Sequence, residues 1–375
     1  MSDSTSWQPP AAPTPGDSAP ESPFGAANWA PPTPVGTGWT PPPKPGLIPL
    51  RPLTLGGILG ASFQVLRRNP RPTFGFALLI TGLLGVVTLL IVGFVSFFAI
   101  ARTSNALAED ADTLAAGAFA SIILAALVPA IFALVSNAIL QGVIALEVAR
   151  GTVGEKLKLS GLWRAARGRI GALVGWSFLI LAVVIAAALV VALLIGLLIA
   201  FGGQAGVVVG VLLAIAVGLG SVVVYAWLGT KLSLVPSILM LERLPLRAAI
   251  GRSWTLTNDF FWRTFGIQIL VAAILNVVAS IISTPLQLAI VFGTSLINPN
   301  GIEEGLVVAG VVLYLLTLVV TLIFGAIAAV VQAATTALIY IDLRMRKEGL
   351  DLELTRFVEA RQAGDTSVDN PYLVS

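Results

Sequence analysis

The sequence has no cysteine and no histidine in 375 residues. The first absence excludes a disulfide framework, and together they remove the side chains that most often bind zinc or copper or act as a catalytic base or thiol nucleophile. Charge is also scarce, since Asp, Glu, Lys and Arg make up 11% of the residues where a soluble domain carries about 25%. Hydrophobic residues make up 57%. The composition therefore predicts a chain whose main solvent is lipid.

The charged residues that are present do not form a pattern typical of an enzyme or a nucleic-acid-binding protein. The formal net charge is +3, and the basic residues are dispersed among apolar runs rather than gathered into a phosphate-binding surface. No phosphate-binding loop occurs, and no pair of apolar stretches carries carboxylates at mid-length. We therefore expect a non-enzymatic protein with no cofactor, no metal site and no nucleic-acid partner.

Residues 1–46 form a region of distinct composition. They hold more than half of the 23 prolines, together with Ser, Thr, Gly and Ala, and have almost no aliphatic side chains to bury. Such a segment is expected to be a disordered, proline-rich cytoplasmic tail. It lacks the basic start and apolar run of a secretory signal peptide, so we expect the first apolar span to direct membrane insertion.

A short Trp-Pro pattern recurs in this tail, as Trp7-Gln8-Pro9-Pro10, Trp29-Ala30-Pro31-Pro32 and Trp39-Thr40-Pro41-Pro42. Proline-rich segments with aromatic side chains can present a preformed surface to a binding protein. Low-complexity sequence can also produce such repetition without a function. A protein partner for the tail is therefore one of two interpretations that stay open.

Six long apolar stretches follow residue 70, near 74–100, 117–147, 171–200, 206–240, 265–293 and 306–341. Each exceeds the ~20 residues that a helix needs to cross the hydrocarbon core of a bilayer. The sequence therefore predicts an all-α transmembrane fold of about six membrane-spanning helices, with a helical membrane domain over 47–358. We expect residues 359–375 to be a C-terminal cytoplasmic tail.

The distribution of basic residues predicts the orientation of these spans. Six Lys or Arg residues lie in 148–170 and four in 241–264, while Arg102 alone falls in the loops on the opposite side. Cytoplasmic loops of membrane proteins carry an excess of Lys and Arg. We therefore expect a multi-pass protein of the cell membrane whose N- and C-termini are both cytoplasmic.

An internal repeat groups the six stretches into three modules, each an amphipathic segment followed by a hairpin of two spans. The modules cover about 51–150, 155–242 and 243–346. They begin with Leu53-Thr54-Leu55, Leu157-Lys158-Leu159 and Leu244-Pro245-Leu246. The first and third modules also share a Thr-Phe-Gly triplet at 73–75 and 264–266. The sequence therefore predicts a threefold construction.

The amphipathic segments are expected to be short helices lying parallel to the membrane on its cytoplasmic side, with Trp163 and Trp254 at the interface. Their apolar residues recur every three or four positions, on one helical face, and about 10 to 15 residues are too few to cross ~30 Å of hydrocarbon. Basic residues accompany them: Arg67, Arg68, Lys158, Arg164, Arg167, Arg169, Arg247, Arg252 and Arg263. The lipid bilayer, with its anionic headgroups, is therefore the predicted partner, although topology alone explains the same charges.

Polar residues inside apolar spans are the first candidates for a functional site, because they are costly in lipid. The candidates are Asn137, Gln141, Lys231, Gln332 and Thr336. They lie near the cytoplasmic end of the second span of each module. Asn137 and Gln141 in the first module correspond to Gln332 and Thr336 in the third, at the same separation as Glu147 and Asp342. A polar vestibule is the functional interpretation. Interhelical hydrogen bonds or solvated helix ends would explain the same residues.

Three stretches carry a resemblance to a known group of proteins: YIDLRMRKEGLDLEL (340–354), RPLTLGGILGASFQVLRRNP (51–70) and RSWTLTNDFFWRTFGIQIL (252–270). The chain resembles actinobacterial integral membrane proteins of unknown function, similar to the membrane domain associated with some glycerophosphoryl diester phosphodiesterases. The resemblance implies an integral membrane protein. It does not imply phosphodiesterase activity, which belongs to a separate barrel domain that uses His, acidic residues and a divalent metal.

Two functions agree with these features. The first is a protein that organises lipid or partner proteins at the cytoplasmic membrane. The second is a transporter or flippase-like carrier of a lipid or other small amphiphile, since internal repeats also build such carriers. A continuous polar path through the bundle would favour the carrier, and a dry, closely packed interior would favour the first.

Overall fold

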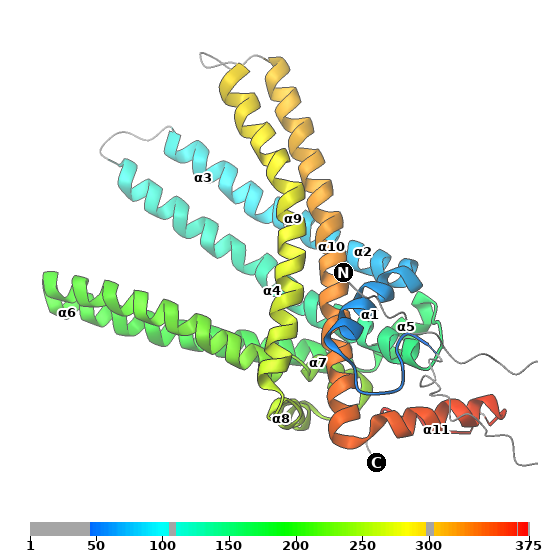
Figure 1. The fold of residues 1–375 in the computed structure, drawn as a ribbon. Coiled ribbons are helices and arrows are strands. Elements are labelled where there is room, and N and C mark those ends of the chain that lie inside the picture. The colour runs from blue at the N-terminus through cyan, green and yellow to red at the C-terminus, as the bar shows by residue number, and fades with distance from the viewer. Residues whose placement is uncertain (1–45, 105–109, 298–303, 366, 374–375) are drawn as a thin grey trace, which may run out of the picture. The chain divides into compact units, whose positions relative to one another are not determined.

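The structure, a computed structural model, describes residues 46–104, 110–297, 304–365 and 367–373. Every regular element in these ranges is a helix (Figure 1). This confirms the all-helical fold that the composition predicts. Except for Gly46, the tail predicted over 1–46 lies outside the described residues.

The helices follow one another along the chain with short connections. They are α1 (Leu55–Arg68), α2 (Pro70–Thr88), η1 (Leu89–Gly93), α3 (Phe94–Ser104), α4 (Ala111–Thr152), α5 (Leu159–Arg167), α6 (Ile170–Leu232), α7 (Val235–Leu241), α8 (Leu246–Thr257), α9 (Phe261–Ile297), α10 (Glu304–Glu348) and α11 (Leu350–Gln362). The π-helical stretch η1 joins α2 to α3 without a break, so that the three form one long apolar helix.

Five helical segments of the described chain are long and apolar enough to cross a membrane. They are Pro70–Ser104, Asp112–Thr152, Ile170–Leu241, Phe261–Ala289 and Val312–Glu348. The third has 72 residues and contains Gly203, whose backbone is not helical (φ 55°, ψ −140°). The parts of α6 before and after this residue lie side by side (Figure 1). A Cβ added to Gly206 would lie 2.0 Å from the carbonyl oxygen of Leu198. Glycine is therefore needed at 203 for its positive φ and at 206 for close approach.

The three predicted amphipathic segments are separate short helices, α1, α5 and α8. Thr54 caps α1, because its hydroxyl oxygen accepts a hydrogen bond from the N–H of Gly57 at 3.1 Å. Asn69 separates α1 from α2 with φ −145° and ψ 67°. A residue before proline disfavours the helical region, whereas proline itself suits the first helical position. The local sequence Asn69-Pro70 therefore sets the corner between the two helices.

The short helices use the centre of each apolar stripe to pack against the rest of the chain. Their buried residues include Ile58, Ser62 and Val65 in α1, Leu162 and Ala166 in α5, and Ala249 and Ser253 in α8. The flanks of the stripes are exposed, at Leu55, Phe63, Leu159 and Trp163. The stripe is therefore divided between a protein-facing centre and a flank that is free to meet lipid.

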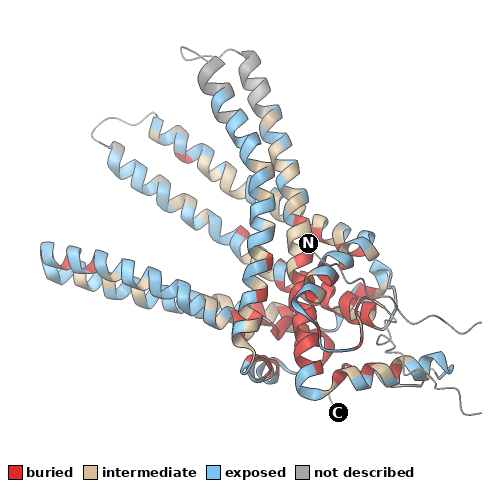
Figure 2. Cartoon of the chain, in the orientation of Figure 1, coloured by how far each residue is buried: buried red, intermediate tan, exposed pale blue. Residues whose placement is uncertain are grey.

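The buried core lies where the short helices surround the ends of α4 and α10 (Figure 2). All seven residues of α7 are buried, and α7 is a separate helix within the predicted apolar stretch at 206–240. The helix α6 ends at Leu232, and α7 opens with Pro236 in its first turn, a position that suits proline. The candidate spans contrast with this core, because at most 17% of the most apolar window of each is buried.

The C-terminal region is more structured than the tail that we predicted over 359–375. Gly349, in the left-handed conformation with φ 68°, ends α10 and starts α11. α11 runs to Gln362, so the predicted boundary falls inside a helix. Beyond it, Tyr372 is only 3% exposed. The aromatic ring of Tyr372 is part of the buried core, although it follows a polar segment whose composition does not indicate burial.

Candidate functional site: charged clusters at the helix ends

The predicted vestibule residues form local pairs. The side-chain amide of Gln141 donates to that of Asn137 one turn away on α4, and the hydroxyl of Thr336 donates to the carbonyl oxygen of Gln332 at 3.1 Å on α10. Lys231, at the end of α6, bonds instead to a side chain in the connection between α8 and α9. Over the described residues, no hydrogen bond joins the pair on α4, the pair on α10 and Lys231 to one another. A shared vestibule therefore stays a prediction.

A buried carboxylate on α10, Asp342, forms the first charged cluster. It is 1% exposed and accepts hydrogen bonds from the backbone N–H of Leu53 at 2.7 Å, from Arg263 Nη2 at 3.0 Å and from Arg346 Nε at 3.0 Å. Both guanidinium groups also donate to the carbonyl oxygen of Leu53, at 2.7 and 2.8 Å. A buried charge is tolerated when it is paired and hydrogen-bonded in this way. The cluster therefore joins the segment before α1 to α9 and α10.

Glu242, between α7 and α8, is the centre of the second cluster. It is 4% exposed, accepts from the hydroxyl of Tyr340 at 2.8 Å and pairs with Arg252. Arg252 and Arg344 in turn share Glu348, at 2.8 and 2.9 Å. Burial opposes the charge of Arg252, but its hydrogen bond to Glu242 and the two carboxylate charges outweigh burial and raise the pKa of the guanidinium. This cluster joins α8 to α10.

A third set of contacts connects the starts of the predicted modules. The carbonyl oxygens of Leu53, Leu157 and Leu244 accept side-chain hydrogen bonds from Arg263 (2.7 Å), Asn69 (2.9 Å) and Arg169 (3.4 Å), respectively. Each acceptor is the first leucine of a module. Each donor lies at the start of the first long helix of another predicted module. The first predicted module donates to the second, the second to the third and the third to the first.

Several buried polar atoms have no hydrogen-bond partner within the described chain. They are Glu147 Oε2, Thr264 Oγ1, Gln268 Nε2 and Gln332 Oε1. The other oxygen of Glu147 accepts from Asn69 Nδ2 at 3.0 Å. Buried polar atoms are usually paired, so these are the atoms of the structure with unused capacity for water or a ligand.

Some of the basic residues that are predicted to meet lipid headgroups also form bonds inside the protein. They include Arg169, Arg252 and Arg263. Arg68 also donates internally, to the carbonyl oxygens of Gly151 at 2.5 Å and of Glu155 at 3.4 Å. The reason is that buried carboxylates and carbonyl groups need donors, and these arginines are within reach.

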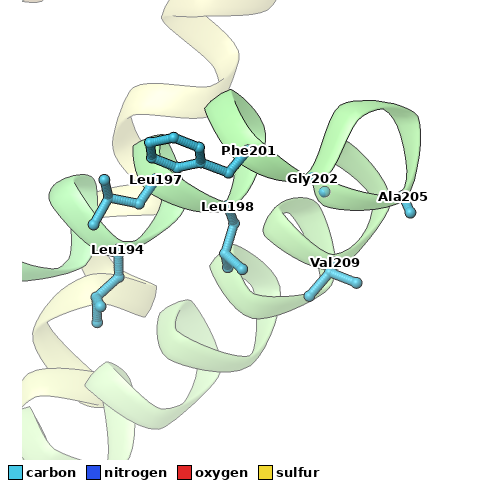
Figure 3. A pocket seen from close by; sticks show the side chains of 8 residues that line it. Leu194, Leu197, Leu198, Phe201, Gly202, Ala205 and Val209 are labelled. Carbon is cyan, nitrogen blue, oxygen red and sulfur yellow. The ribbon is translucent and has the colours of Figure 1, made fainter.

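A hollow of about 500 Å³ lies at the turn of α6, between the two parts of the helix (Figure 3). It is lined by Leu194, Leu197, Leu198, Phe201, Gly202, Ala205, Gly206 and Val209. None of these side chains can ionise or donate a hydrogen bond, so the hollow suits only an apolar occupant. No group of three or more Asp or Glu side chains that could hold a metal ion occurs among the residues that the structure describes.

The sequence pointed to part of this arrangement. The shared offset of Glu147 and Asp342 singled out two carboxylates that are both buried. It missed Glu242, Arg344 and Tyr372, because none of them occupies a repeated position or an apolar span centre. The one available signal was Glu242 itself, an acidic residue directly after a long apolar run.

The long, apolar and exposed helices define the class as an integral membrane protein of helical type. No family model, curated protein or solved structure matches the chain. The resemblance to the membrane domain associated with some phosphodiesterases therefore stays a prediction.

Proposed function

We propose that the chain is a non-enzymatic, multi-pass protein of the cell membrane that organises lipid or partner proteins. The exposure of large apolar side chains along the candidate spans carries this proposal (Figure 2). Leu90, Phe97 and Leu219 are 64%, 68% and 69% exposed, for example. At about 25 cal/mol per Å² of apolar surface, such helices need lipid or another protein around them.

The proposal includes six spans in three modules with both termini cytoplasmic. Gly203 supports the sixth span, because it divides α6 into two parts that lie side by side. The cyclic hydrogen bonds to Leu53, Leu157 and Leu244 support the threefold construction, since equivalent leucines meet equivalent helix starts.

Cysteine labelling tests this topology on a sequence that has no cysteine of its own. We expect a membrane-impermeant maleimide to label Gln204→Cys and Asn300→Cys in intact cells, and to label Ser367→Cys only after permeabilisation, because the basic residues lie on the side of the termini. If Gln204→Cys were labelled only after permeabilisation or not at all, the α6 hairpin would not cross the membrane, and the number of spans would fall to four. Labelling of Ser367→Cys in intact cells would show that the orientation is opposite to the one proposed.

Lipid is the favoured partner because the surface offers places for both ends of a lipid. A hollow of about 540 Å³ along α1 is lined by Gly60, Phe63, Gln64, Arg67 and Arg68. It combines an aromatic ring, an amide and guanidinium groups, as the boundary between acyl chains and phosphates requires. The hollow in α6 is apolar throughout and suits acyl chains.

The carrier of a lipid or other amphiphile is the second candidate, and one observation favours it. Thr264 and Gln268 on α9 and Gln332 on α10 each have a buried polar atom without a partner in the described chain. Two neighbouring helices with unpaired polar atoms are what a polar path would require.

Reconstitution separates these functions. Purified protein is exchanged into fresh detergent, and the phospholipid that stays bound is measured by native mass spectrometry. The same protein is placed in vesicles of phosphatidylcholine and phosphatidylglycerol, and dithionite quenching of a fluorescent lipid reports transbilayer movement. We expect retained phosphatidylglycerol and the same quenching as in protein-free vesicles. Accelerated movement would favour the carrier, and the absence of retained lipid would contradict a lipid-organising function.

A further inference from the structure

Lys231 is a buried cation without a carboxylate partner in the described chain. It is 6% exposed, and its Nζ donates a hydrogen bond to Asn258 Oδ1 at 2.8 Å. An ammonium group has three donors. Burying a charge is costly unless an opposite charge and hydrogen bonds compensate it, so the environment of Lys231 lacks one negative charge.

Two aromatic rings lie within about 6 Å of this ammonium group. Lys231 Nζ lies 5.2 Å from the ring centre of Trp254 and 6.0 Å from that of Phe261. Trp227 packs edge-on against Trp254 at 5.3 Å. Cation–π contacts within about 6 Å are favourable, but each contributes less than a paired charge. The rings thus hold the cation and do not neutralise it.

The backbone at Lys231 is held in place as well. The hydroxyl of Ser253 on α8 donates to the carbonyl oxygen of Lys231 at 2.7 Å. Ser253 is fully buried. The position of the ammonium group is therefore determined by α6 and α8 together and is not that of a freely moving surface lysine.

Lys347 on α10 provides a contrast within the same region. It contacts the end of α8 and the connection to α9, with its Nζ 2.8 Å from the carbonyl oxygen of Thr255 and 5.7 Å from the ring of Phe260. Unlike Lys231, it has an acidic partner, Asp259, at 2.7 Å. The hydrogen bond and the charge of Lys347 lower the pKa of Asp259, and the charge of Lys231 lowers it to a smaller extent. Asp259 is therefore paired with Lys347, and the positive charge of Lys231 stays without an ion pair among the described residues.

We propose that Lys231 binds the phosphate of an anionic phospholipid at the junction of α6, α8 and α9, an inference that rests on the proposed lipid-organising function. Asn258 is exposed, so a phosphate oxygen can replace its amide oxygen as the acceptor. Trp227 and Trp262, 45% and 78% exposed, lie on the two helices beside the site, and exposed tryptophan is typical of the headgroup layer. The phosphate supplies the negative charge that the site lacks.

The test compares variants of the full-length protein for retention of phosphatidylglycerol by native mass spectrometry and for the rise in thermal midpoint that added phosphatidylglycerol produces. We expect Lys231→Met to weaken retention about tenfold or more, because a hydrogen bond to a charged group contributes that much to binding. Lys347→Met would free Asp259 to neutralise Lys231, so the matched control is Arg150→Met, which removes a cation that is paired with Glu155 at 3.0 Å and should retain lipid like the wild type. Lys231→Arg should keep most of the binding.

Asn258→Asp keeps the test decisive even if Lys231→Met does not fold. The new carboxylate would lie beside Lys231 and complete its ion pair, so we expect a stable protein that nevertheless retains less phosphatidylglycerol. Equal retention by the wild type, Asn258→Asp and Lys231→Met would overturn this site while leaving the proposed function intact. No retention by the wild type would overturn both. Inorganic phosphate that raises the thermal midpoint as much as phosphatidylglycerol would overturn the assignment to a lipid.

Discussion

Replacing Asp342 with asparagine is expected to lower the free energy of unfolding by about 3–5 kcal/mol, the cost of removing one partner from a buried ion pair. The carboxylate is 1% exposed and pairs with Arg263 and Arg346. Without it, two guanidinium groups near the segment before α1 would lose their counter-charge. The neutral amide could still accept one hydrogen bond but could not balance two cations.

The measurement is unfolding of the purified protein in mild detergent by sodium dodecyl sulfate, followed by tryptophan fluorescence. Asp259→Asn is the control, because Asp259 also forms an ion pair but its side chain is 74% exposed. Such surface pairs contribute little to stability, and we expect no resolvable change. If both variants unfolded like the wild type, the cluster around Asp342 would not hold these helices together.

The second large effect is expected at the C-terminus, where Tyr372→Ala should destabilise the protein by about 3 kcal/mol, as for other buried aromatic side chains replaced by alanine. The ring is 3% exposed, and the hydroxyl contacts Thr152 and donates to the carbonyl oxygen of Ala149 at 3.1 Å. The carbonyl oxygen of Tyr372 also accepts from Arg344 Nη1 at 3.1 Å. The end of the chain is thus attached to both α4 and α10.

Two variants separate the ring from its hydroxyl and from its position in the sequence. Tyr372→Phe keeps the ring and should cost about 1 kcal/mol, the net value of a hydrogen bond. Leu373→Ala alters an exposed neighbour and should change stability by less than about 0.5 kcal/mol. If Tyr372→Ala were as stable as Leu373→Ala in the same detergent titration, the C-terminal segment would not pack on the core in solution.

The same hydroxyl predicts a dependence on alkaline pH. Burial raises the pKa of Tyr372, whereas an unfolded tyrosine titrates near pH 10. Its contribution to stability is therefore complete below about pH 10 and is lost as the pH rises from there toward the folded pKa. The thermal midpoint of the wild type should accordingly fall more steeply above about pH 10 than that of Tyr372→Phe.

The fold class could be predicted from the sequence because it depends on composition and on local patterns. Long apolar runs require helices in lipid, and the stripes of α1, α5 and α8 have a period that only a helix satisfies. Local residues also indicate where helices break, as at Asn69-Pro70. The polar candidates were less predictable, since Gln141 and Asn137 form a local pair whereas Lys231 lies beside residues of α8 and α9.

The sequence by itself determined that this chain is helical, apolar and divided into spans and short amphipathic helices, because each of these properties comes from the residues of one segment. Only the tertiary structure decided which charges are paired. Asp342 meets Leu53 across 289 positions and Tyr372 meets Thr152 across 220, and no local pattern records such distances. The same physical reason explains Lys231: a lysine after an apolar run reads as an ordinary helix end until the packing of α8 and α9 leaves it buried without a counter-charge.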